Sequence, residues 1–395
     1  MAKLTVKDLR DLKGKRVFVR VDYNVPVKEA RITDDTRIRA SLPTLQHLLK
    51  AGARVVLASH LGRPKKGPAP EFRLKPAATR LGELIGRPVT MAPDCVGPEV
   101  QEMAAALPEG GALLLENVRF HPEEEKNDPA FAARLIADTG ATVFVNDAFG
   151  SAHRAHASTE GVSHHVPLSV AGFLMEKELR YLGLALDAPE RPFVAVLGGA
   201  KVSDKIQVID NLLPRVDLLL VGGGMAYTFF RAKGYPTGKS LVEEDKVDLA
   251  RTLLDKAKGK IQLPVDHVVA TAFQADAEHR ACAATEVPDG WMGLDIGPAT
   301  SLAFGEEVRK AKIVLWNGPM GVFEMEPFAQ GTLAMARALA DCKGTTIVGG
   351  GDSVAAVMQM GLAEKIDHVS TGGGASLEFL AGDPLPGVAC LKDAA

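Results

Sequence analysis

Short apolar runs rich in valine, isoleucine and leucine recur along the chain, and the stretches between them have helical spacing and are punctuated by glycine and proline. Runs that are apolar on both faces and alternate with possible crossover helices are typical of parallel strands covered on both sides. The pattern therefore predicts an α/β protein with open, doubly wound sheets. The runs cover residues 16–22, 54–59, 112–117 and 142–147 in the first half, and 193–198, 216–222, 265–270, 312–317, 345–350 and 367–372 in the second.

The length of the chain favours two domains. Its 395 residues are too many for one ordinary hydrophobic core. Between the two sets of runs lies a segment with apolar residues at helical spacings, which Pro189 and Pro192 end. We therefore expect two doubly wound, mainly parallel-sheet domains, 1–171 and 189–379, joined by a connecting helix over 172–188, with a cleft between them.

Composition excludes several classes of protein. The formal net charge of −3 offers no global basic field for nucleic acid or a membrane surface. The four cysteines lie far apart without a CxxC pair, which indicates reduced thiols rather than zinc ligands or a disulfide framework. The N-terminus lacks the apolar stretch of a signal peptide, and no later run reaches the length of a membrane span. These features predict a cytoplasmic protein that binds neither nucleic acid nor membranes.

The residues that follow the runs in the first half are rich in arginine. Ligands of open α/β sheets bind beyond the carboxyl ends of the strands, so these are candidate functional residues. Guanidinium groups donate paired hydrogen bonds to planar anions. Arginines at four strand ends therefore predict a site for a small, highly charged anion. The candidates are Asp22, Asn24, His60, Arg63, Arg119, His153, Arg154 and His156, together with Arg37, which lies nearby at a predicted helix start.

Each candidate also has a less specific interpretation. A single arginine near a loop is commonly solvated or paired at the surface, and only its recurrence favours a shared site. His153 and His156 could bind a metal, but with no cysteine nearby and Arg154 between them, packing or anion contact is favoured. Asp22 could be a general base, orient arginines or hold a substrate hydroxyl. We favour the holding role.

The runs of the second half end in glycine. Glycine lets the backbone approach phosphate oxygens, and a helix that begins after the loop supplies free N–H groups and a favourable dipole. One such turn is weak evidence, because tight turns use glycine for steric reasons alone. Five of them predict a nucleotide site in this half. The loops cover residues 197–205, 221–226, 316–324, 349–353 and 371–376.

Three side chains in these loops are candidates for phosphate or metal contact. Lys201 and Lys205 are four residues apart around a predicted helix start and could point together at phosphates. Asp352, at the start of the predicted helix after GGGD, could hold Mg²⁺, cap the helix, or do both. The segment 234–240 resembles a Walker A loop, but it has too few residues between its glycines and follows a helical stretch instead of a strand. We therefore reject it as a phosphate loop.

Eleven motifs, taken in order, resemble those of the phosphoglycerate kinase family nearly from end to end. They are RVDYNVP, ITDDTRI, SHLGRP, LENVRFHPEEE, NDAFGSAHRAH, GGAKVSDK, GGGMAYTF, LDIGP, WNGPMGVFE, GGGDS and STGGGAS. The resemblance implies reversible phosphoryl transfer between 1,3-bisphosphoglycerate and MgADP, giving 3-phosphoglycerate and MgATP in glycolysis or gluconeogenesis. It also implies that the C-terminal segment, about 380–395, completes the N-terminal domain. We expect the protein to be a monomer.

The resemblance further implies roles for individual residues. Asp22, Asn24, Arg37, His60, Arg63, Arg119 and Arg154 match phosphoglycerate contacts, with Arg37 reaching the transferring group. Lys201, Lys205, Asn317, Glu324 and Ser353 match positions that hold the phosphates and ribose, and Gly199, Ala200, Gly222, Gly223, Leu294, Pro319 and Val322 match the walls around the adenine. Gly350 and Gly351 complete the nucleotide set, Asp352 matches the Mg-linked aspartate, and Arg37, Lys205, Gly351 and Gly373 are the catalytic candidates. Ser353 stands where many relatives carry threonine, and Asp383 stands where a basic residue is common.

The implied chemistry needs no general base, because a carboxylate with a pKa of about 4 is already ionised at pH 7. The task is to align donor and acceptor and to neutralise the charge on the transferring group. Arg37, Lys205 and the amides of residues 349–353 and 371–376 can do this, with Mg²⁺ on the nucleotide. Because the two sites are expected on different domains, we expect the domains to close, with hinges in the connecting helix and near Thr371.

Two other functions fit the same architecture. An NAD-linked oxidoreductase needs GxGxxG after an early strand and an acidic residue about 20 positions later, and the glycine clusters here lack that spacing. A sensor of anions or nucleotides would bind both ligands without turnover. An assay of ATP consumption that depends on 3-phosphoglycerate separates these functions.

Overall fold

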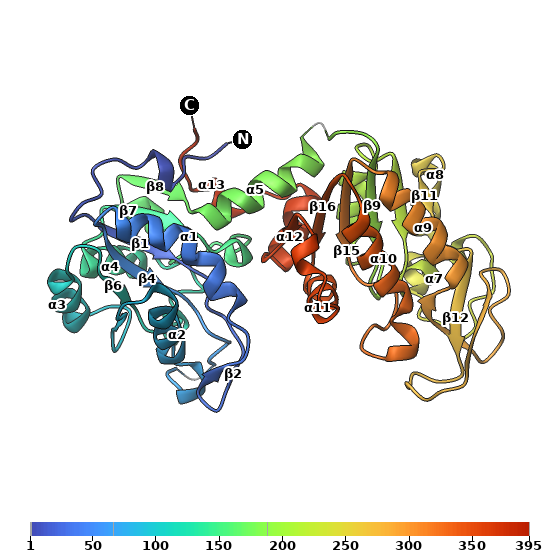
Figure 1. Ribbon diagram of the computed structural model, residues 1–395, viewed down its shortest axis with the longest axis horizontal. Coiled ribbons are helices and arrows are strands. Elements are labelled where there is room, and N and C mark those ends of the chain that lie inside the picture. Colours follow the sequence, from blue (N-terminus) through green and yellow to red (C-terminus); the bar gives the residue numbers. More distant parts are fainter. Residues whose placement is uncertain (1, 66, 188, 395) are drawn as a thin grey trace. The chain divides into compact units, whose positions relative to one another are not determined.

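The computed structural model describes residues 2–65, 67–187 and 189–394 of the chain (Figure 1). These residues form two compact units, the first from Met1–Leu179 with Pro384–Ala395 and the second from Arg180–Asp383. Helix α5 (Phe173–Leu186) contributes residues to both units. The helix expected near the middle of the chain is therefore present. Residue 188, its predicted last residue, lies outside the described residues, and the finer domain bounds stay a prediction.

The first unit is built on a six-stranded sheet in which every pair of strands is parallel. The strand order is β5-β6-β4-β1-β7-β8. Residues of the central strands are buried on both faces, which explains why their runs show no polar alternation. The strands are β1 (Arg16–Arg20), β4 (Arg54–Ala58), β5 (Thr90–Met91), β6 (Ala112–Leu114), β7 (Val143–Asn146) and β8 (Leu168–Ala171).

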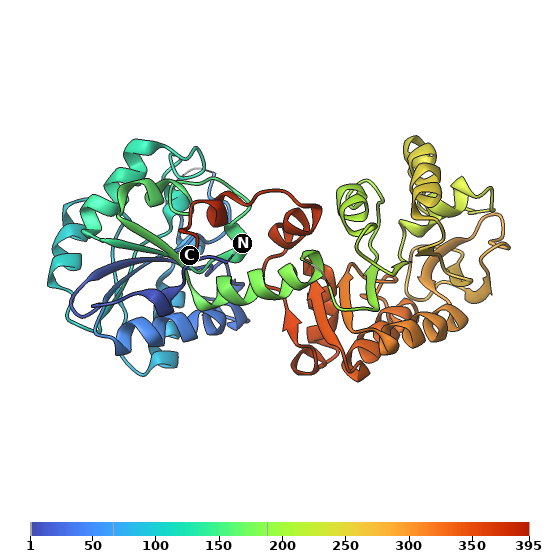
Figure 2. The same cartoon turned by 90° about the horizontal axis from the view of Figure 1, so that it is seen from above.

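Helices cover both faces of this sheet (Figure 2). Helix α1 (Thr36–Lys50) packs beside α2 (Lys75–Ile85), and α3 (Pro98–Ala106) packs beside α4 (Pro129–Thr139). Local sequence signals set the ends of α4, because the Asp128 side chain accepts a hydrogen bond from the Phe131 N–H and Gly140 ends the helix in the left-handed conformation. A small hairpin, β2 (Val27–Lys28) and β3 (Arg31–Ile32), precedes α1.

The end of the chain returns to the first unit. After α12 (Gly374–Ala381) of the second unit, the short helix α13 (Pro386–Ala389) returns to the first unit, near β7 and β8 (Figure 1). The Asn146 side chain donates to the Gly387 carbonyl at 2.7 Å, and the Lys392 N–H donates to the Ser169 carbonyl at 2.9 Å. The C-terminal segment thus packs on the first unit, although the rest of that unit ends at Leu179, more than half of the sequence earlier.

The second unit has its own six-stranded parallel sheet, with the order β11-β10-β9-β15-β16-β17. The chain proceeds from β9 to one edge of the sheet and later from β15 to the other edge. The topological switch point therefore lies between β9 and β15, where open α/β sheets bind ligands. The strands are β9 (Phe193–Leu197), β10 (Leu218–Val221), β11 (Ile261–Gln262), β15 (Ile313–Asn317), β16 (Thr345–Gly349) and β17 (His368–Val369).

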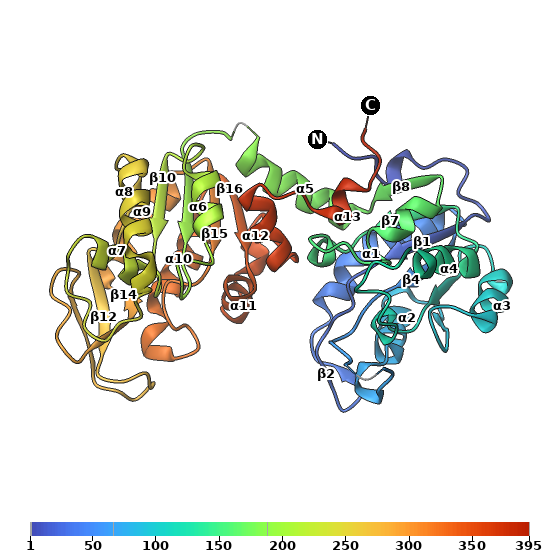
Figure 3. The ribbon, with the colours of Figure 1, turned by 180° about the vertical axis from the view of Figure 1, so that it is seen from behind.

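Helices also cover both faces of the second sheet. Those on the face seen in Figure 3 are α6 (Ile206–Leu212), α7 (Ala226–Ala232), α8 (Val247–Ala257) and α12 (Gly374–Ala381), and those on the face seen in Figure 1 are α9 (Pro298–Lys310), α10 (Gln330–Asp341) and α11 (Gly351–Gln359). Both sheets are thus doubly wound, as the apolar runs predict. None of the described helices combines the length and apolar character that crossing a bilayer requires.

One predicted parallel strand is placed wrongly by the sequence pattern. The run 265–270 forms β12 (Asp266–Ala270), which pairs antiparallel with β13 (His279–Ala283) and β14 (Met292–Ile296) in a separate three-stranded sheet. The connection from β12 to β13 is too short for the crossover that a parallel pair needs. The burial of successive residues along β12 also alternates, unlike the burial of the central strands.

Candidate active site

The predicted anion-binding residues of the first unit lie beyond the carboxyl ends of β1, β4, β6 and β7. Arg37 is the second residue of α1, at the helix start expected from the sequence. Its Nη1 donates to both carboxylate oxygens of Asp22 at 3.2 Å and to the Asn24 carbonyl at 3.0 Å. The Asn24 side chain accepts from the Gly62 N–H at 2.8 Å, which joins the loops after β1 and β4. Asp22 here orients Arg37, and its favoured role of holding a substrate hydroxyl stays a prediction.

A buried arginine, Arg20, sets the tautomer and the protonation state of His60. Arg20 is the last residue of β1, and its Nη2 lies 3.1 Å from His60 Nδ1. A guanidinium group has only donors, so Nδ1 must accept and the proton of a neutral His60 must lie on Nε2. Burial, followed by the charges of Arg20 and Arg119, holds the pKa of His60 well below its usual value. His60 is therefore a neutral hydrogen-bond donor at this sheet edge.

Arg119 and Arg154 also lie close to histidines of this sheet edge, His153 and His156. Arg119 Nη1 donates to the Gly62 carbonyl at 2.8 Å, and Arg154 Nε donates to His153 Nε2 at 3.1 Å. Burial, followed by the charges of Arg119, Arg20 and Arg154, lowers the pKa of His156 to about 4. The structure therefore brings these cations together at one edge of the sheet.

Arg63 is the most exposed of the predicted arginines. It lies in the loop after β4, and its charge adds to that of Arg154 in lowering the pKa of Arg119, for which burial is the main cause. Arg119 is nearly buried, and its Nε lies 3.3 Å from a carboxylate oxygen of Glu125. One acidic side chain thus offsets part of the positive charge at this edge.

Sequence reasoning missed Arg20, because the residue belongs to a strand and does not follow one. The signal was present as a charged residue inside the otherwise apolar run RVFVRVD. Its guanidinium is held by the Ser158 hydroxyl at 2.8 Å, and Ser158 in turn donates to the carboxylate of buried Glu124 at 2.6 Å. A buried charge is tolerated here because a buried acid lies within the same network.

The second unit contains a cavity of about 390 Å³ at its topological switch point. Predicted residues that line it are Gly199, Ala200, Gly223, Leu294, Pro319, Val322, Glu324 and Asp352. Leu241 and Phe273 also line it, although both side chains are about half exposed. Exposed apolar side chains beside a cavity are suited to covering a flat, apolar ligand group.

Polar residues gather beside this cavity without lining it. The Lys205 ammonium donates to the Asn317 side-chain oxygen, and the Ser353 hydroxyl accepts from the Gly318 N–H at 2.6 Å. Burial lowers the pKa of Lys205 to about 8, while the nearby carboxylates of Asp204 and Asp352 act in the opposite direction. Lys205 thus lies within electrostatic reach of Asp352.

Two local features of this region narrow the possibilities left open by the sequence. Helix α6 begins only at Ile206, after a turn, so Lys201 and Lys205 do not share a helical face. Lys205 is buried and Lys201 is exposed. Asp352 does not cap α11, because Gly350 occupies the N-cap position and no side chain caps it. The Asp352 carboxylate is exposed beside the helix start and is left free for another role.

Glycine is required where the loops after β9, β10 and β16 approach one another and the end of β15. Gly223 has φ +68°, and a Cβ there would lie 2.7 Å from the backbone N and O of Gly199. Gly350 has φ +87°, and its Cβ would lie 2.9 Å from the Asn317 side-chain nitrogen. A Cβ on Gly222 would lie 2.6 Å from Met320 Sδ, so this residue packs behind the cavity.

The two remaining predicted glycines lie at helix starts. Gly351 is the first residue of α11, and Gly373, with φ +53°, directly precedes α12. A Cβ on either would meet nothing within 4 Å. Both positions are therefore open beside the first free N–H groups of a helix, where an anion is stabilised.

Several cavity residues were missed. Tyr227, Lys239, Phe273 and Asp295 line it, and they come from α7, from the antiparallel sheet and from loops that flank these elements. Lys239 lies in the rejected Walker-like segment, which follows α7 as expected but still contributes a side chain.

Asp295 is buried beside this cavity. It accepts hydrogen bonds from the N–H groups of Gly331 at 2.7 Å and Ile296 at 2.9 Å, and burial raises its pKa to about 7. The motif LDIGP contains Asp295, but only Leu294 was assigned a role from it. The Gly331 contact ties the start of α10 to β14, next to the cavity wall.

Comparison with known proteins decides the family. A family model described as phosphoglycerate kinase matches residues 6–383. The chain belongs to the phosphoglycerate kinase family. A phosphoglycerate kinase of Moorella thermoacetica is 63% identical over 396 residues, which cover 100% of both chains. A cytosolic phosphoglycerate kinase of Triticum aestivum is 61% identical over 391 residues, which cover 97% of both chains.

Solved structures of the family share the fold. The phosphoglycerate kinase of Coxiella burnetii superimposes with a TM-score of 0.89 at 42% identity, and that of Pyrococcus horikoshii with a TM-score of 0.86 at 36% identity. Each match covers 98% of both chains. The resemblance drawn from the motifs and the two-domain α/β fold are therefore confirmed. The chain is an enzyme of glycolysis that transfers phosphoryl groups reversibly, which excludes the oxidoreductase and the non-catalytic sensor.

Proposed function

We propose that this enzyme transfers the acyl phosphate of 1,3-bisphosphoglycerate to MgADP, giving 3-phosphoglycerate and MgATP, and catalyses the reverse reaction. The observation that supports this most directly is the convergence of arginines and neutral histidines at one sheet edge of the first unit. Such a cluster suits a small substrate that carries both a phosphate and a carboxylate.

The phosphoglycerate is proposed to bind in the first unit. Arg63, Arg119 and Arg154 supply fixed positive charge, and the Nε2–H of His60 adds a neutral donor. Arg37, already oriented by Asp22, is proposed to contact the group that is transferred. Asn24 fixes the loop that carries these groups.

The nucleotide is proposed to bind in the cavity of the second unit. Its apolar walls, including Leu294 and Val322, suit the adenine, and exposed Glu324 suits the ribose hydroxyls. Lys205 and the first N–H groups of α11 suit the phosphates. Lys201, Asn317, Ser353 and Gly373 are proposed to support the same phosphates.

Magnesium is proposed to accompany the nucleotide. Asp352 fits this role, because its carboxylate is exposed, is not used as a helix cap and lies near Lys205. Mg²⁺ is commonly held by one or two carboxylates together with phosphate oxygens and water. When bound, it would neutralise charge on the phosphates of the nucleotide.

The residues on this chain have to align the reactants and not to move a proton. The attacking carboxylate is ionised, so transfer needs cations and fixed N–H donors around the phosphoryl oxygens. Arg37, Lys205 and the amides at Gly351 and Gly373 can supply them. Because the two substrates are assigned to different units, we propose that turnover requires the units to bring them together and to exclude water.

The names of the relatives support a proposal for the cellular setting. Two of them are named as cytosolic enzymes. We propose the same location here, with small-molecule substrates as the partners and a monomer as the working form.

A coupled assay tests this function. The purified enzyme is expected to consume ATP only when both 3-phosphoglycerate and Mg²⁺ are present. 2-Phosphoglycerate serves as the control acceptor, because its phosphate and carboxylate are spaced differently. ATP consumption that is independent of 3-phosphoglycerate, or equal turnover of both acids, would contradict the proposed substrate.

A further inference from the structure

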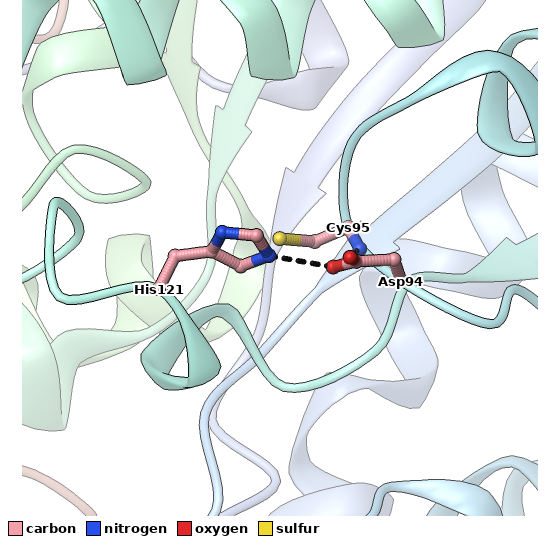
Figure 4. A group of neighbouring side chains, drawn as sticks. All are labelled: Asp94, Cys95 and His121. Carbon is pink, nitrogen blue, oxygen red and sulfur yellow. Dashed lines mark hydrogen bonds and ion pairs between the residues drawn. The ribbon is translucent and has the colours of Figure 1, made fainter. Parts of the chain in front are cut away.

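Asp94, Cys95 and His121 form a cluster of metal-type ligands in the first unit that the phosphoryl-transfer chemistry does not use (Figure 4). Asp94 and Cys95 lie in the loop between β5 and α3, and His121 directly follows the short 3₁₀ helix Val118–Phe120. One carboxylate oxygen, one thiol sulfur and one ring nitrogen lie within 4.8 Å of one another. Figure 4 shows the sulfur beside the histidine ring.

The three side chains are already held in place. His121 Nε2 lies 2.7 Å from Asp94 Oδ1, the same oxygen that accepts from the Cys95 N–H at 2.6 Å. The ring of His121 stacks on Phe131 with centroids 5.1 Å apart. Cys95 is fully buried, whereas Asp94 and His121 are partly exposed. A metal ion could therefore enter from the solvent side with little rearrangement.

Thiolate, imidazole and carboxylate are the side-chain ligands that zinc binds most often. A tetrahedral zinc ion with bonds of about 2.0–2.3 Å holds its ligand atoms roughly 3.5 Å apart. The ligand atoms of Asp94, Cys95 and His121 lie within 4.8 Å of one another. Small side-chain rotations can therefore bring them to the spacing that zinc needs. We propose that Asp94, Cys95 and His121 bind one zinc ion, with water as the fourth ligand.

Zinc at this position would join two loops of the first unit. It would replace the hydrogen bond between His121 Nε2 and Asp94 and add a bond to the Cys95 sulfur, and the protons lost from the thiol and from Nε2 would pass to solvent water. His121 lies two residues after Arg119, whose guanidinium belongs to the proposed anion site. The ion would therefore restrain the turn that carries Arg119. This proposal departs from the interpretation of the cysteines as thiols that bind no zinc. That interpretation rested on the absence of a CxxC motif, whereas these three ligands meet only through the fold.

Cobalt is a suitable probe, because Co²⁺ takes tetrahedral zinc sites and a cobalt–thiolate bond absorbs in the near ultraviolet. Metal-free enzyme without nucleotide is titrated with Co²⁺ and then with Zn²⁺. We expect one cobalt ion per chain, a thiolate band that grows on titration, and its loss when zinc displaces cobalt. Absence of a thiolate band at saturating Co²⁺ would overturn the proposal.

Variants test which residues bind the metal. Cys95→Ser should remove the thiolate band, and His121→Gln should weaken cobalt binding at least tenfold, as expected for loss of a ligand. Cys390→Ser and Asp352→Ala are matched controls that remove another thiol and the proposed magnesium aspartate, and both should keep the band. A band that persists in Cys95→Ser, or disappears in Cys390→Ser, would overturn the assignment.

Thermal unfolding with Zn²⁺ provides a second measurement that does not depend on the buried cysteine. Asp94→Asn and His121→Gln change partly exposed side chains, so both should fold even if Cys95→Ser does not. Zinc should raise the unfolding temperature of the parent enzyme and have a much smaller effect on these two variants. An equal increase in the parent and both variants would show that zinc binds elsewhere and would contradict the proposal.

Discussion

The two units build their proposed anion sites from different materials. The first unit uses side-chain cations, with Arg37, Arg119 and a neutral His60 at one sheet edge. The second uses backbone, with Gly223 and Gly350 allowing close approach between loops beside a cavity. Both sheets are parallel and six-stranded, so the difference lies in the residues that follow the strands. On this proposal, the same fold class supports two modes of anion recognition.

This difference has consequences for mutation. A side-chain site should lose charge when one residue is truncated while its backbone stays in place. A backbone site should lose shape when a single methyl group is added, because the added atom would overlap a neighbouring loop. The two modes should also respond differently to pH, since guanidinium groups stay charged whereas a partly buried lysine does not.

The largest effect is expected from Arg37→Ala. If Arg37 neutralises charge on the transferring group, its loss should lower kcat by about 10²-fold or more, the typical effect of removing one transition-state donor. The affinity for nucleotide alone should not change. Arg39→Ala is the matched control, because Arg39 lies on the same helix and pairs with Asp35 instead. Steady-state kinetics of both variants test this role. A near-parental kcat in Arg37→Ala would show that Arg37 does not contact the transferring group.

Gly223→Ala should distort the cavity that is proposed to bind nucleotide. The added Cβ would lie 2.7 Å from the Gly199 backbone, so we expect nucleotide affinity to fall at least tenfold. Gly234→Ala is the control, because Gly234 also has positive φ but a Cβ there would meet nothing within 4 Å. It should cost only about 1 kcal/mol of stability and leave affinity intact. Calorimetric titration with ADP compares the two, and equal affinities would refute the backbone model.

Lys205 should give nucleotide binding a characteristic pH dependence. Its pKa of about 8 in the free enzyme means that the protonated fraction falls about eightfold between pH 7.5 and pH 9. ADP affinity should weaken by a similar factor over this range. The dependence should be retained in Lys201→Met, whose lysine is exposed, and lost in Lys205→Met. Titrations at several pH values measure it, and an unchanged slope in Lys205→Met would contradict the assignment.

The last effect is on stability in acid and not on ligand binding or catalysis. Because the pKa of His156 is about 4 in the folded enzyme and about 6.5 when unfolded, the unfolded state binds the extra proton between these values. Stability should therefore fall as the pH decreases below 6.5, by about 1–2 kcal/mol at pH 5 from this residue. His156→Gln should reduce this loss, and His165→Gln, at an exposed position, should not. Urea unfolding at pH 7.5 and 5 tests the difference between the two variants.

The sequence predicted what depends on local pattern. Apolar runs identified the main parallel strands, and Arg37 was placed correctly at the start of a helix. What it missed depends on pairing in three dimensions. The run 265–270 has the composition of the other strands, and only its partners β13 and β14 make it antiparallel.

The missed site residues have the same explanation. Arg20 lies within a strand and reaches His60 from below, so no rule about strand ends selects it. Lys239 and Asp295 line the cavity because the antiparallel sheet and its flanking loops fold beside it. The metal-type cluster likewise joins two loops that are distant in sequence. Motifs therefore locate a site, but the residues that support it come from the tertiary fold.

The most direct test of the difference between the two proposed sites is a crystal structure of the enzyme with 3-phosphoglycerate and MgADP. We expect the acid to be bound by the side chains of Arg37, His60 and Arg119. The ADP should lie in the cavity between the ends of β9 and β15, with its phosphates beside the N–H groups at the start of α11. An acid held mainly by backbone amides, or a nucleotide bound outside that cavity, would contradict the division between a side-chain site and a backbone site.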